Sequence, residues 1–599
     1  MSFSGATRPS PAASVSDSHA GKRSALPTWV LFVIVSLVSV LPYLRVTEFG
    51  FVYDDDVQIL QNPLLNSWHS LRAIFSHQSW SFLYPAAPGG YYRPAFLIWL
   101  SINHHVFDAR PAGWHLSSLL LHAIVSGLTF LLLRRHGFSP WTACGGALLF
   151  GLHPVHVESV AWISGSTDLL VAAGLLVSLL LWWTSQDRRS NPPWIFLLSL
   201  FFYLIALLTK ETAIVFPAII FVYAYFQAQD SAVKPTHRGD RFLSAFRNAL
   251  PYAVVAGIYL ALRRAVLGGF ATNISFADLK TFLATAPELL LFYIRHVAWP
   301  SHHSLFYDVY PRMEFASSSF LVPLLVLIAL AGLAAWLAMG SSTFSVVSAL
   351  AWLLFPLLPV LWVPFFSRGD LAHDRYLYLP SLGTAILFAA LLRRVGVYRQ
   401  WRYRLTVAAT AALLLLMAFS TAVHSSPWRD NLSLYSHSCS AYPDHPIACN
   451  NLAVALISRG EFFRAREVLR PLLHGDGNAS RAYGMFGIAS YRLADYADAE
   501  AALRRATQLD ASYADAYLYL ALTYNRTNRA QEAESLLRHA INLDPTGDGY
   551  HLALGSVLMV EHKYREACQE FRAELQVRPG LPAAISLLHD CEQQLGPAS

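Results

Sequence analysis

Long apolar stretches dominate the first two thirds of the chain. From Leu26 to about Val423 they recur at lengths that can cross a bilayer, and short polar segments separate them. A transmembrane helix needs about 20 predominantly apolar residues. The pattern therefore predicts about 11 transmembrane helices, at 28–46, 113–134, 141–157, 162–184, 193–209, 212–228, 248–265, 319–338, 344–364, 376–394 and 404–423. A further stretch, 282–299, is predicted to lie in the membrane interface without crossing it.

The hydrophobic pattern changes after Ser425, where small and apolar residues recur at helical spacing. A 34-residue period, typical of tetratricopeptide repeats, aligns four units without gaps, at 446–479, 480–513, 514–547 and 548–581. Alanine recurs at one place in each unit, where two helices of a hairpin approach closely: Ala465, Ala499, Ala533 and Ala567. We therefore predict helical hairpins stacked into a superhelix, whose concave groove binds an extended peptide or another protein.

These patterns predict an all-α protein in three parts. Residues 1–25 are rich in serine, alanine and proline and are predicted to form a disordered cytoplasmic tail, 26–424 a membrane domain, and 425–599 a soluble repeat domain. The composition agrees, because 55% of the 599 residues are apolar and only 14% are charged, whereas soluble proteins carry about 25% charged residues. Too few charges remain to cover a water-facing surface, which excludes a soluble enzyme.

The net charge of +6 comes largely from basic residues in alternate connections between the predicted spans. Such loops stay in the cytoplasm; they hold Lys22 and Arg23, Arg134 and Arg135, Arg188 and Arg189, Lys234 to Arg247, and Arg393 to Arg404. An odd number of crossings then places residues 425–599 outside the cytoplasm. We expect the periplasm of a bacterium, or the lumen of the endoplasmic reticulum in a eukaryote. The basic charge thus reflects membrane topology and predicts no nucleic-acid partner.

Three consecutive carboxylates follow the first predicted span, in FVYDDDVQILQNP (51–63). Carboxylates beside a bilayer are costly unless they are solvated or used. A carboxylate of this loop is a candidate for a general base, or for holding a cation, at the boundary between membrane and water. An ordinary acidic loop is the alternative.

Isolated cations on the same predicted face are candidate ligands for a lipid-linked phosphate. Arg93 starts an apolar helix in YYRPAF, Lys210 separates two apolar runs in LLTKETAIVFP, and Arg375 precedes YLYLP. Ammonium and guanidinium groups form charge-assisted hydrogen bonds with phosphate. The alternatives are a snorkelling side chain for Arg93 and a buried ion pair between Lys210 and Glu211.

The segment HPVHVESVAWISGSTDLL adds four polar side chains between two predicted spans: His153, His156, Glu158 and Asp168. Two histidines near a glutamate suggest a metal, but Pro154 interrupts the turn and no third histidine is fixed. We therefore predict that these four residues and Glu211 line the site as polar groups without a structural metal. The five cysteines show none of the spacings that are typical of zinc sites. The sequence does not decide whether disulfides join Cys439 to Cys449 or Cys568 to Cys591.

In their order along one chain, these motifs resemble the transmembrane and tetratricopeptide-repeat O-mannosyltransferases of the GT-C glycosyltransferase superfamily. The resemblance runs from about residue 28 to 590 and rests on FVYDDDVQILQNP, YYRPAF, GWHLSSLLLHA, LFGLHPVHVESVAWISGSTDLL, LLTKETAIVFP, DRYLYLPSLG and the downstream repeats. Two positions depart from the family pattern. Thr167 stands before Asp168 where arginine is usual, and Asp374 stands before Arg375 where glutamate is usual.

The resemblance implies a GT-C-type membrane domain that moves a sugar, mannose in the family's chemistry, from a polyprenyl- or dolichyl-phosphate donor to an acceptor hydroxyl of a protein. The family's paired acidic motif matches Asp54 and Asp55, its lysine matches Lys210, and its arginine matches Arg375. We expect Asp55, assisted by Asp54, to take the proton of the acceptor hydroxyl while Lys210 and Arg375 hold the donor phosphate. Inversion of the anomeric centre would need no metal, or only a weakly linked divalent cation.

Two rival functions stay open. The same fold could transfer sugar to a lipid or polysaccharide, including the ligation of a polymer, although such ligases lack an acidic pair directly after the first span. Alternatively, the membrane domain is catalytically inactive and the repeats form an assembly scaffold. The arginine-rich, lysine-poor composition favours a bacterial source and therefore undecaprenyl phosphate as the donor lipid.

Overall fold

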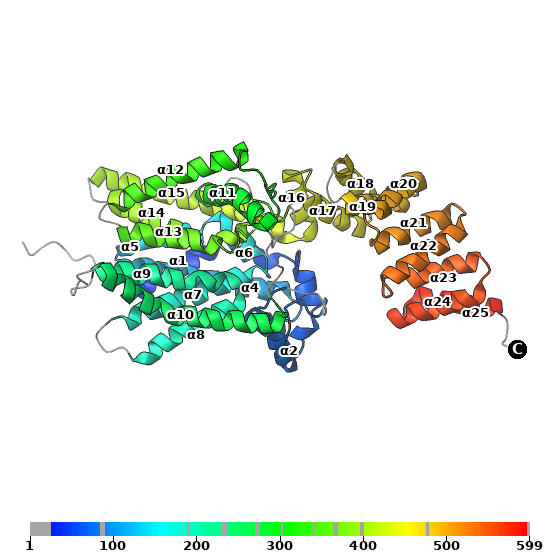
Figure 1. The fold of residues 1–599 in the computed structure, drawn as a ribbon, viewed down its shortest axis with the longest axis horizontal. Helices are drawn as coiled ribbons and strands as arrows, with labels where there is room; N and C mark the ends of the chain where they lie inside the picture. Colours follow the sequence, from blue (N-terminus) through cyan, green and yellow to red (C-terminus); the bar gives the residue numbers. More distant parts are fainter. Residues whose placement is uncertain are drawn as a thin grey trace, which may run out of the picture.

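The computed structural model describes residues 26–83, 90–187, 192–230, 238–269, 276–300, 303–339, 343–362, 369–395, 400–474 and 479–595. Within these ranges every regular element is a helix, which confirms the all-α fold class. The helices form a bundle and a row of hairpins that projects from one end of it (Figure 1). The predicted tail, residues 1–25, lies outside the described residues, as do Arg188, Arg189 and Lys234.

The bundle is built from long apolar helices joined by short turns. Its α-helices are α1 (Thr28–Val40), α2 (Leu71–Ser76), α3 (Pro94–Phe107), α4 (Pro111–Arg135), α5 (Pro140–Gly151), α6 (Val157–Ala161), α7 (Ser166–Ser185), α8 (Pro193–Thr209), α9 (Phe216–Asp230), α10 (Arg238–Leu267), α11 (Phe276–Ala298), α12 (Ser318–Ala338), α13 (Thr343–Leu354), α14 (Ser381–Val395) and α15 (Gln400–Ser425). Short helical turns carry much of the chemistry: η1 (Leu41–Glu48), η2 (Asp56–Leu60), η5 (Pro154–His156), η6 (Glu211–Val215) and η9 (Asp374–Leu377).

Six helices in the described part of the chain are long and apolar enough to cross a membrane: Thr28–Glu48, Pro111–Arg135, Ser166–Ser185, Gly239–Leu267, Ser318–Trp336 and Trp401–Arg429. Shorter apolar helices occupy three further predicted spans, at Pro193–Thr209, Glu211–Phe226 and Thr343–Leu357. In Ser318–Trp336 and in Trp401–Arg429, only 6% of the most apolar 18-residue stretch is buried inside the protein, as contact with lipid requires. The structure therefore supports a polytopic membrane domain, whereas the exact number of 11 spans is not established.

Two predicted spans end earlier than their hydrophobicity suggests. The span predicted at 141–157 corresponds to α5, which ends at Gly151. The span predicted at 344–364 corresponds to α13, which ends at Leu354. Prolines at 154 and 356 follow these ends, and proline cannot supply the N–H that continues a helix. The first break turns the chain through η5 into α6, which places Glu158 at the end of the bundle instead of inside a continuous helix.

The C-terminal part starts with α16 (Asn431–Ala441) and continues as antiparallel hairpins. These are α17 with α18 (Pro446–Ser458, Phe462–Leu469), α19 with α20 (Ala479–Arg492, Tyr496–Leu509), α21 with α22 (Ala514–Arg526, Ala530–Leu543) and α23 with α24 (Tyr550–Val560, Tyr564–Val577), followed by α25 (Pro582–Leu595). Figure 1 shows them as a curved row leading away from the bundle. The fold is the repeat solenoid that the period predicted.

Backbone geometry repeats with the same period. The turn inside each hairpin contains a residue with positive φ, at Gly460, Ala494, Asn528 and His562, each 34 positions after the one before. The four recurring alanines, from Ala465 to Ala567, are fully buried between the helices, because a larger side chain would separate each pair. Both disulfides that the sequence left undecided are present: Cys439 bonds to Cys449, and Cys568 bonds to Cys591.

Candidate functional site

The acidic loop lies between η1 and η2, at the end of the bundle that faces the C-terminal hairpins. Asp55 is fully buried there. Its Oδ1 accepts hydrogen bonds from the backbone N–H of Ser164 at 2.9 Å and from the Ser164 hydroxyl at 2.6 Å. Its Oδ2 accepts from the backbone N–H of Val52 at 3.2 Å. Asp55 therefore ties the acidic loop to the turn before α7, and both of its oxygens are engaged.

Asp54 is the more accessible of the two carboxylates. It is only partly buried, and none of the hydrogen bonds found among the described residues ends on its side chain. Burial, opposed by the charge of Arg375, raises the pKa of Asp54 to about 6. Burial also raises the pKa of Asp55, against the hydrogen bonds from Ser164, to about 7. A carboxylate with a pKa near 6 is well suited to accept a proton at neutral pH.

Three ion pairs join the cations and the acids that the sequence singled out. Each joins residues far apart in the chain: Arg93 with Glu211, Lys210 with Asp168, and Arg375 with Glu158. All six partners sit where a helix begins or ends or in the short turns between helices. The structure thus gathers six of the ten candidate residues into pairs at one end of the bundle.

Arg375 is the cation whose charge acts on Asp54. Its guanidinium forms a close ion pair with Glu158, and its backbone N–H donates to the second carboxylate oxygen of Glu158 at 3.1 Å. The guanidinium carbon lies 5.3 Å from the ring centroid of Trp162 and 5.1 Å from that of Tyr376. Aromatic faces and one carboxylate therefore orient Arg375, and 14% of its side chain stays exposed.

Lys210 is held differently from the sequence-based alternative. Its Nζ donates to both oxygens of Asp168, at 2.7 and 2.8 Å, and the two side chains are only 5% and 6% exposed. This alternative, a pair between Lys210 and Glu211, does not form, because the backbone turns into η6 between them and Glu211 instead pairs with Arg93. The Arg93 pair is two-pronged, with nitrogen–oxygen distances of 2.6 and 3.1 Å.

His153 and His156 are not brought into this cluster. The Nε2 of His153 bonds to the carbonyl of Val297 at 3.0 Å, and the Nε2 of His156 bonds to the hydroxyl of Ser381 at 2.8 Å. Both imidazoles are buried. They connect the turn at Pro154 to α11 and α14. The two histidines therefore help to pack the turn that positions Glu158.

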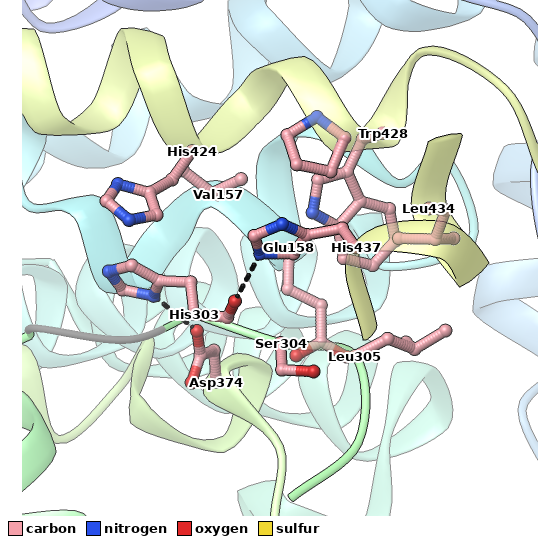
Figure 2. A pocket seen from close by; sticks show the side chains of 11 residues that line it. Val157, Glu158, His303, Ser304, Leu305, Asp374, His424, Trp428, Leu434 and His437 are labelled. Carbon is pink, nitrogen blue, oxygen red and sulfur yellow. Dashed lines mark hydrogen bonds and ion pairs between the residues drawn. The ribbon is translucent and has the colours of Figure 1, made fainter. Parts of the chain in front are cut away.

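Asp374 precedes Arg375 and is bonded to His303 (Figure 2). Its oxygens accept hydrogen bonds from His303 Nδ1 at 2.6 Å and from the hydroxyl of Tyr307 at 2.6 Å, and they lie 2.9 Å from His296 Nε2. Although burial opposes it, the charges of His296 and His303 hold the pKa of Asp374 well below its usual range. This network fixes the start of η9 and with it the direction of Arg375.

The same residues offer three possible metal-ligand atoms within 4.8 Å of one another, on His296, His303 and Asp374. However, their separations of 2.6 and 2.9 Å are hydrogen-bond distances. Ligand atoms around a tetrahedral zinc, with bonds of about 2.0–2.1 Å, lie further apart than that. The arrangement fits a proton-bridged network better than a metal site.

Several residues of the site lie inside the quoted motifs, but nothing in the motifs assigns them a role. Ser164 holds Asp55, and Trp162 lies 5.5 Å from the ring of Tyr53, between the acidic loop and Arg375. The ring of Tyr376 lies 5.4 Å from Lys210 and so connects two of the ion pairs. Each of these contacts spans a long separation along the chain, so no local pattern could have found it.

Known proteins match both parts of the chain. Residues 492–556 match the family model described as "Tetratricopeptide repeat". Protein O-mannosyl-transferase TMTC3 of Mus musculus is 24% identical over 606 residues, covering 93% of this chain and 65% of that protein. Protein O-mannosyl-transferase TMTC4 of Homo sapiens is 27% identical over 504 residues, covering 74% of this chain and 66% of that protein.

Among solved structures, the crystal structure of MamA matches at 24% identity with a TM-score of 0.22, covering 24% of this chain and 85% of MamA. The chain spans 62–65% of the length of the first three protein O-mannosyl-transferases that it matches. The resemblance expected from the motifs is confirmed: over most of its length this chain is similar to the protein O-mannosyl-transferases.

Proposed function

We propose that the chain is an integral-membrane mannosyltransferase that moves mannose from a polyprenyl-phosphate donor to a hydroxyl group of a protein acceptor. The observation that carries the proposal is Asp54, a partly exposed carboxylate whose pKa burial raises and the charge of Arg375 lowers, so that a candidate base lies within the electrostatic reach of an oriented guanidinium. A base for a hydroxyl and a cation for a phosphate are the two groups that this transfer needs. The similar proteins are named as protein O-mannosyl-transferases, which supports the same reaction.

In the proposed reaction, the acceptor hydroxyl gives its proton to Asp54 as its oxygen attacks the anomeric carbon of the sugar. The bond between that carbon and the phosphate oxygen breaks, and the electron pair leaves with the lipid phosphate. One displacement inverts the anomeric centre. We propose Asp54 rather than Asp55 as the base, because both oxygens of Asp55 already accept hydrogen bonds inside the protein.

Arg375 and Arg93 are the proposed ligands of the donor phosphate. Their side chains are 14% and 16% exposed, whereas Lys210 is 5% exposed and already bonded to both oxygens of Asp168. A guanidinium has five N–H donors, more than one carboxylate partner can accept. Preorganised charges of this kind stabilise the negative charge that develops on a leaving phosphate. We propose that Lys210 contributes only its charge.

The direct test is sugar transfer by the purified protein in lipid bilayers. Radiolabelled mannosyl phosphate on an undecaprenyl or dolichyl carrier is supplied with serine- and threonine-containing peptides, in the presence of EDTA. Label in the peptide is the expected result, and its retention in EDTA supports transfer without a divalent cation. Label only in lipid or polysaccharide would favour the first rival function. No transfer from either carrier to any acceptor class would favour the scaffold.

The pH dependence of transfer follows from the raised pKa of Asp54. Its unprotonated form is the base, so the rate is expected to be constant above about pH 7 and to fall about tenfold per unit of pH below the pKa near 6. The measurement is kcat/KM against pH in a non-perturbing buffer series, because kcat/KM reports the groups of the free enzyme. A rate that stays level down to pH 4 would exclude a carboxylate with a raised pKa as the base.

We further propose that the acidic loop and residues 425–599 lie on the non-cytoplasmic side, with the repeat groove presenting the acceptor. The basic connections support this topology, and so do two disulfides in the C-terminal part, because disulfides persist in oxidising compartments.

Cysteine labelling tests this topology. An impermeant thiol reagent is expected to label Gln531→Cys, on exposed α22, in intact cells, and to label Arg402→Cys, at the exposed start of α15, only after lysis. The background is low because Cys144 is buried and the other four cysteines are bridged. The reverse pattern would place the acidic loop in the cytoplasm and contradict the proposed donor.

A further inference from the structure

Asn431, the first residue of α16, makes two hydrogen bonds to the acidic loop. The amide oxygen of Asn431 accepts a hydrogen bond from the backbone N–H of Tyr53 at 2.7 Å. Its amide nitrogen donates to a carboxylate oxygen of Asp56 at 3.0 Å. One side chain therefore holds the residues on both sides of Asp54 and Asp55.

The loop needs such a hold because its backbone is strained. Tyr53 has a φ of 57°, in the left-handed region that side chains other than glycine rarely adopt. A strained residue persists only where the surrounding structure determines it. The N–H of Tyr53 has its partner in Asn431, so this hydrogen bond acts directly at the strained residue and sets the direction in which Asp54 leaves the backbone.

The start of α16 is itself firmly placed. The side chain of Asp430 accepts from the backbone N–H of Ser433 at 2.8 Å and so caps the helix. The Cys439–Cys449 bridge joins α16 to α17. Just before α16, the carbonyl of Arg429 accepts from the backbone N–H of Gly50 at 3.0 Å, and the ring of Trp428 stacks on Trp162 with centroids 6.4 Å apart.

We propose that Asn431 is a positioning residue of the transferase, so that the C-terminal domain supplies part of the active-site framework and not only a groove for the acceptor. It acts through the loop and does not touch the reacting atoms. The catalytic meaning of this role rests on the proposed function. The mechanical role, holding residues 50–56 in one conformation, is independent of it and can be measured separately.

The experiment compares Asn431→Ala, Asn431→Asp and the double variant Asn431→Asp with Asp56→Asn. Alanine removes both hydrogen bonds. Aspartate keeps an acceptor for the N–H of Tyr53 but places a carboxylate against Asp56. The double variant exchanges amide and carboxylate between the two positions, which restores the hydrogen bond with its donor and acceptor reversed. Asn542→Ala, at an exposed position of α22, is the matched control.

Hydrogen exchange of the peptide covering residues 49–58 is the first readout. Exchange at Tyr53 is expected to accelerate about tenfold or more in Asn431→Ala and to stay unchanged in Asn542→Ala, since removing its acceptor exposes the N–H. The second readout is transfer. Because misplacement of a reacting group by about 1 Å can cost ~10²-fold, kcat is expected to fall by that order in Asn431→Ala with KM for the donor nearly constant.

The exchange of partners separates positioning from simple loss of structure. Asn431→Asp is expected to be at least as slow as Asn431→Ala, and the double variant to recover most of the rate. Loop exchange that is unchanged in Asn431→Ala would overturn the mechanical role. Accelerated exchange with normal kcat would overturn the positioning role. If the wild type transfers no sugar, the proposed function fails, while the exchange data still decide whether Asn431 holds the loop.

Discussion

Replacing Asp54 with asparagine is expected to lower the rate of sugar transfer by about 10²–10⁴-fold, the usual contribution of a positioned general base. The amide keeps the size of the side chain but cannot take the proton of the acceptor hydroxyl. Asp54 is partly exposed and accepts no hydrogen bond that the described residues supply, so the melting temperature and donor affinity should change little. Single-turnover transfer in lipid bilayers measures the rate without interference from product release.

Asp55→Asn is the matched control, and its expected effect is mainly on stability. Each oxygen of Asp55 accepts hydrogen bonds from N–H or O–H donors of Ser164 or Val52. In the variant, the NH2 group of the asparagine replaces one of these oxygens and therefore faces another donor. An unsatisfied buried group costs about 1–3 kcal/mol. We expect a lower melting temperature and a loss of activity that follows the loss of folded protein. A stable but inactive Asp55→Asn beside an active Asp54→Asn would instead make Asp55 the base.

Among the three ion pairs of the site, removing the cation of the most buried one should have the largest effect on folding. Lys210→Ala leaves Asp168 buried and unpaired, which is expected to cost about 3–5 kcal/mol of the free energy of unfolding. Both partners are nearly inaccessible, with side chains 5% and 6% exposed. Thermal unfolding of the purified variant in detergent measures the loss, and donor binding is measured on the fraction that remains folded.

Two further variants define what this loss means. Lys210→Met with Asp168→Leu removes both charges and should recover most of the stability, because an apolar pair of similar volume can replace a buried ion pair. Arg135→Ala breaks the exposed pair with Asp187, whose side chains are 36% and 54% exposed, and should cost no more than about 1 kcal/mol. If the double variant folds but no longer binds the donor, Lys210 is a phosphate ligand after all.

Sequence periodicity by itself determined the architecture. Apolar stretches of bilayer length and a 34-residue period are both local properties of the chain, because each helix needs its own apolar face whatever it packs against. The recurring alanines, buried from Ala465 to Ala567, show the period acting at the level of packing. Where local hydrophobicity misled, as at the ends of α5 and α13, prolines at 154 and 356 had already marked the break.

Only the tertiary structure decided the partners. The sequence could single out Lys210, Arg375 and the acidic loop as costly residues beside a membrane, yet the only partner that it offered for Lys210 within the chain was the neighbouring Glu211. The folded chain instead pairs Lys210 with Asp168, 42 positions away, and holds Tyr53 by Asn431, 378 positions away. Burial likewise distinguishes Asp54 from Asp55, two identical side chains in one motif. The free energy of a charge depends on its solvent and its neighbours, and both are set by the fold and not by adjacency in the chain.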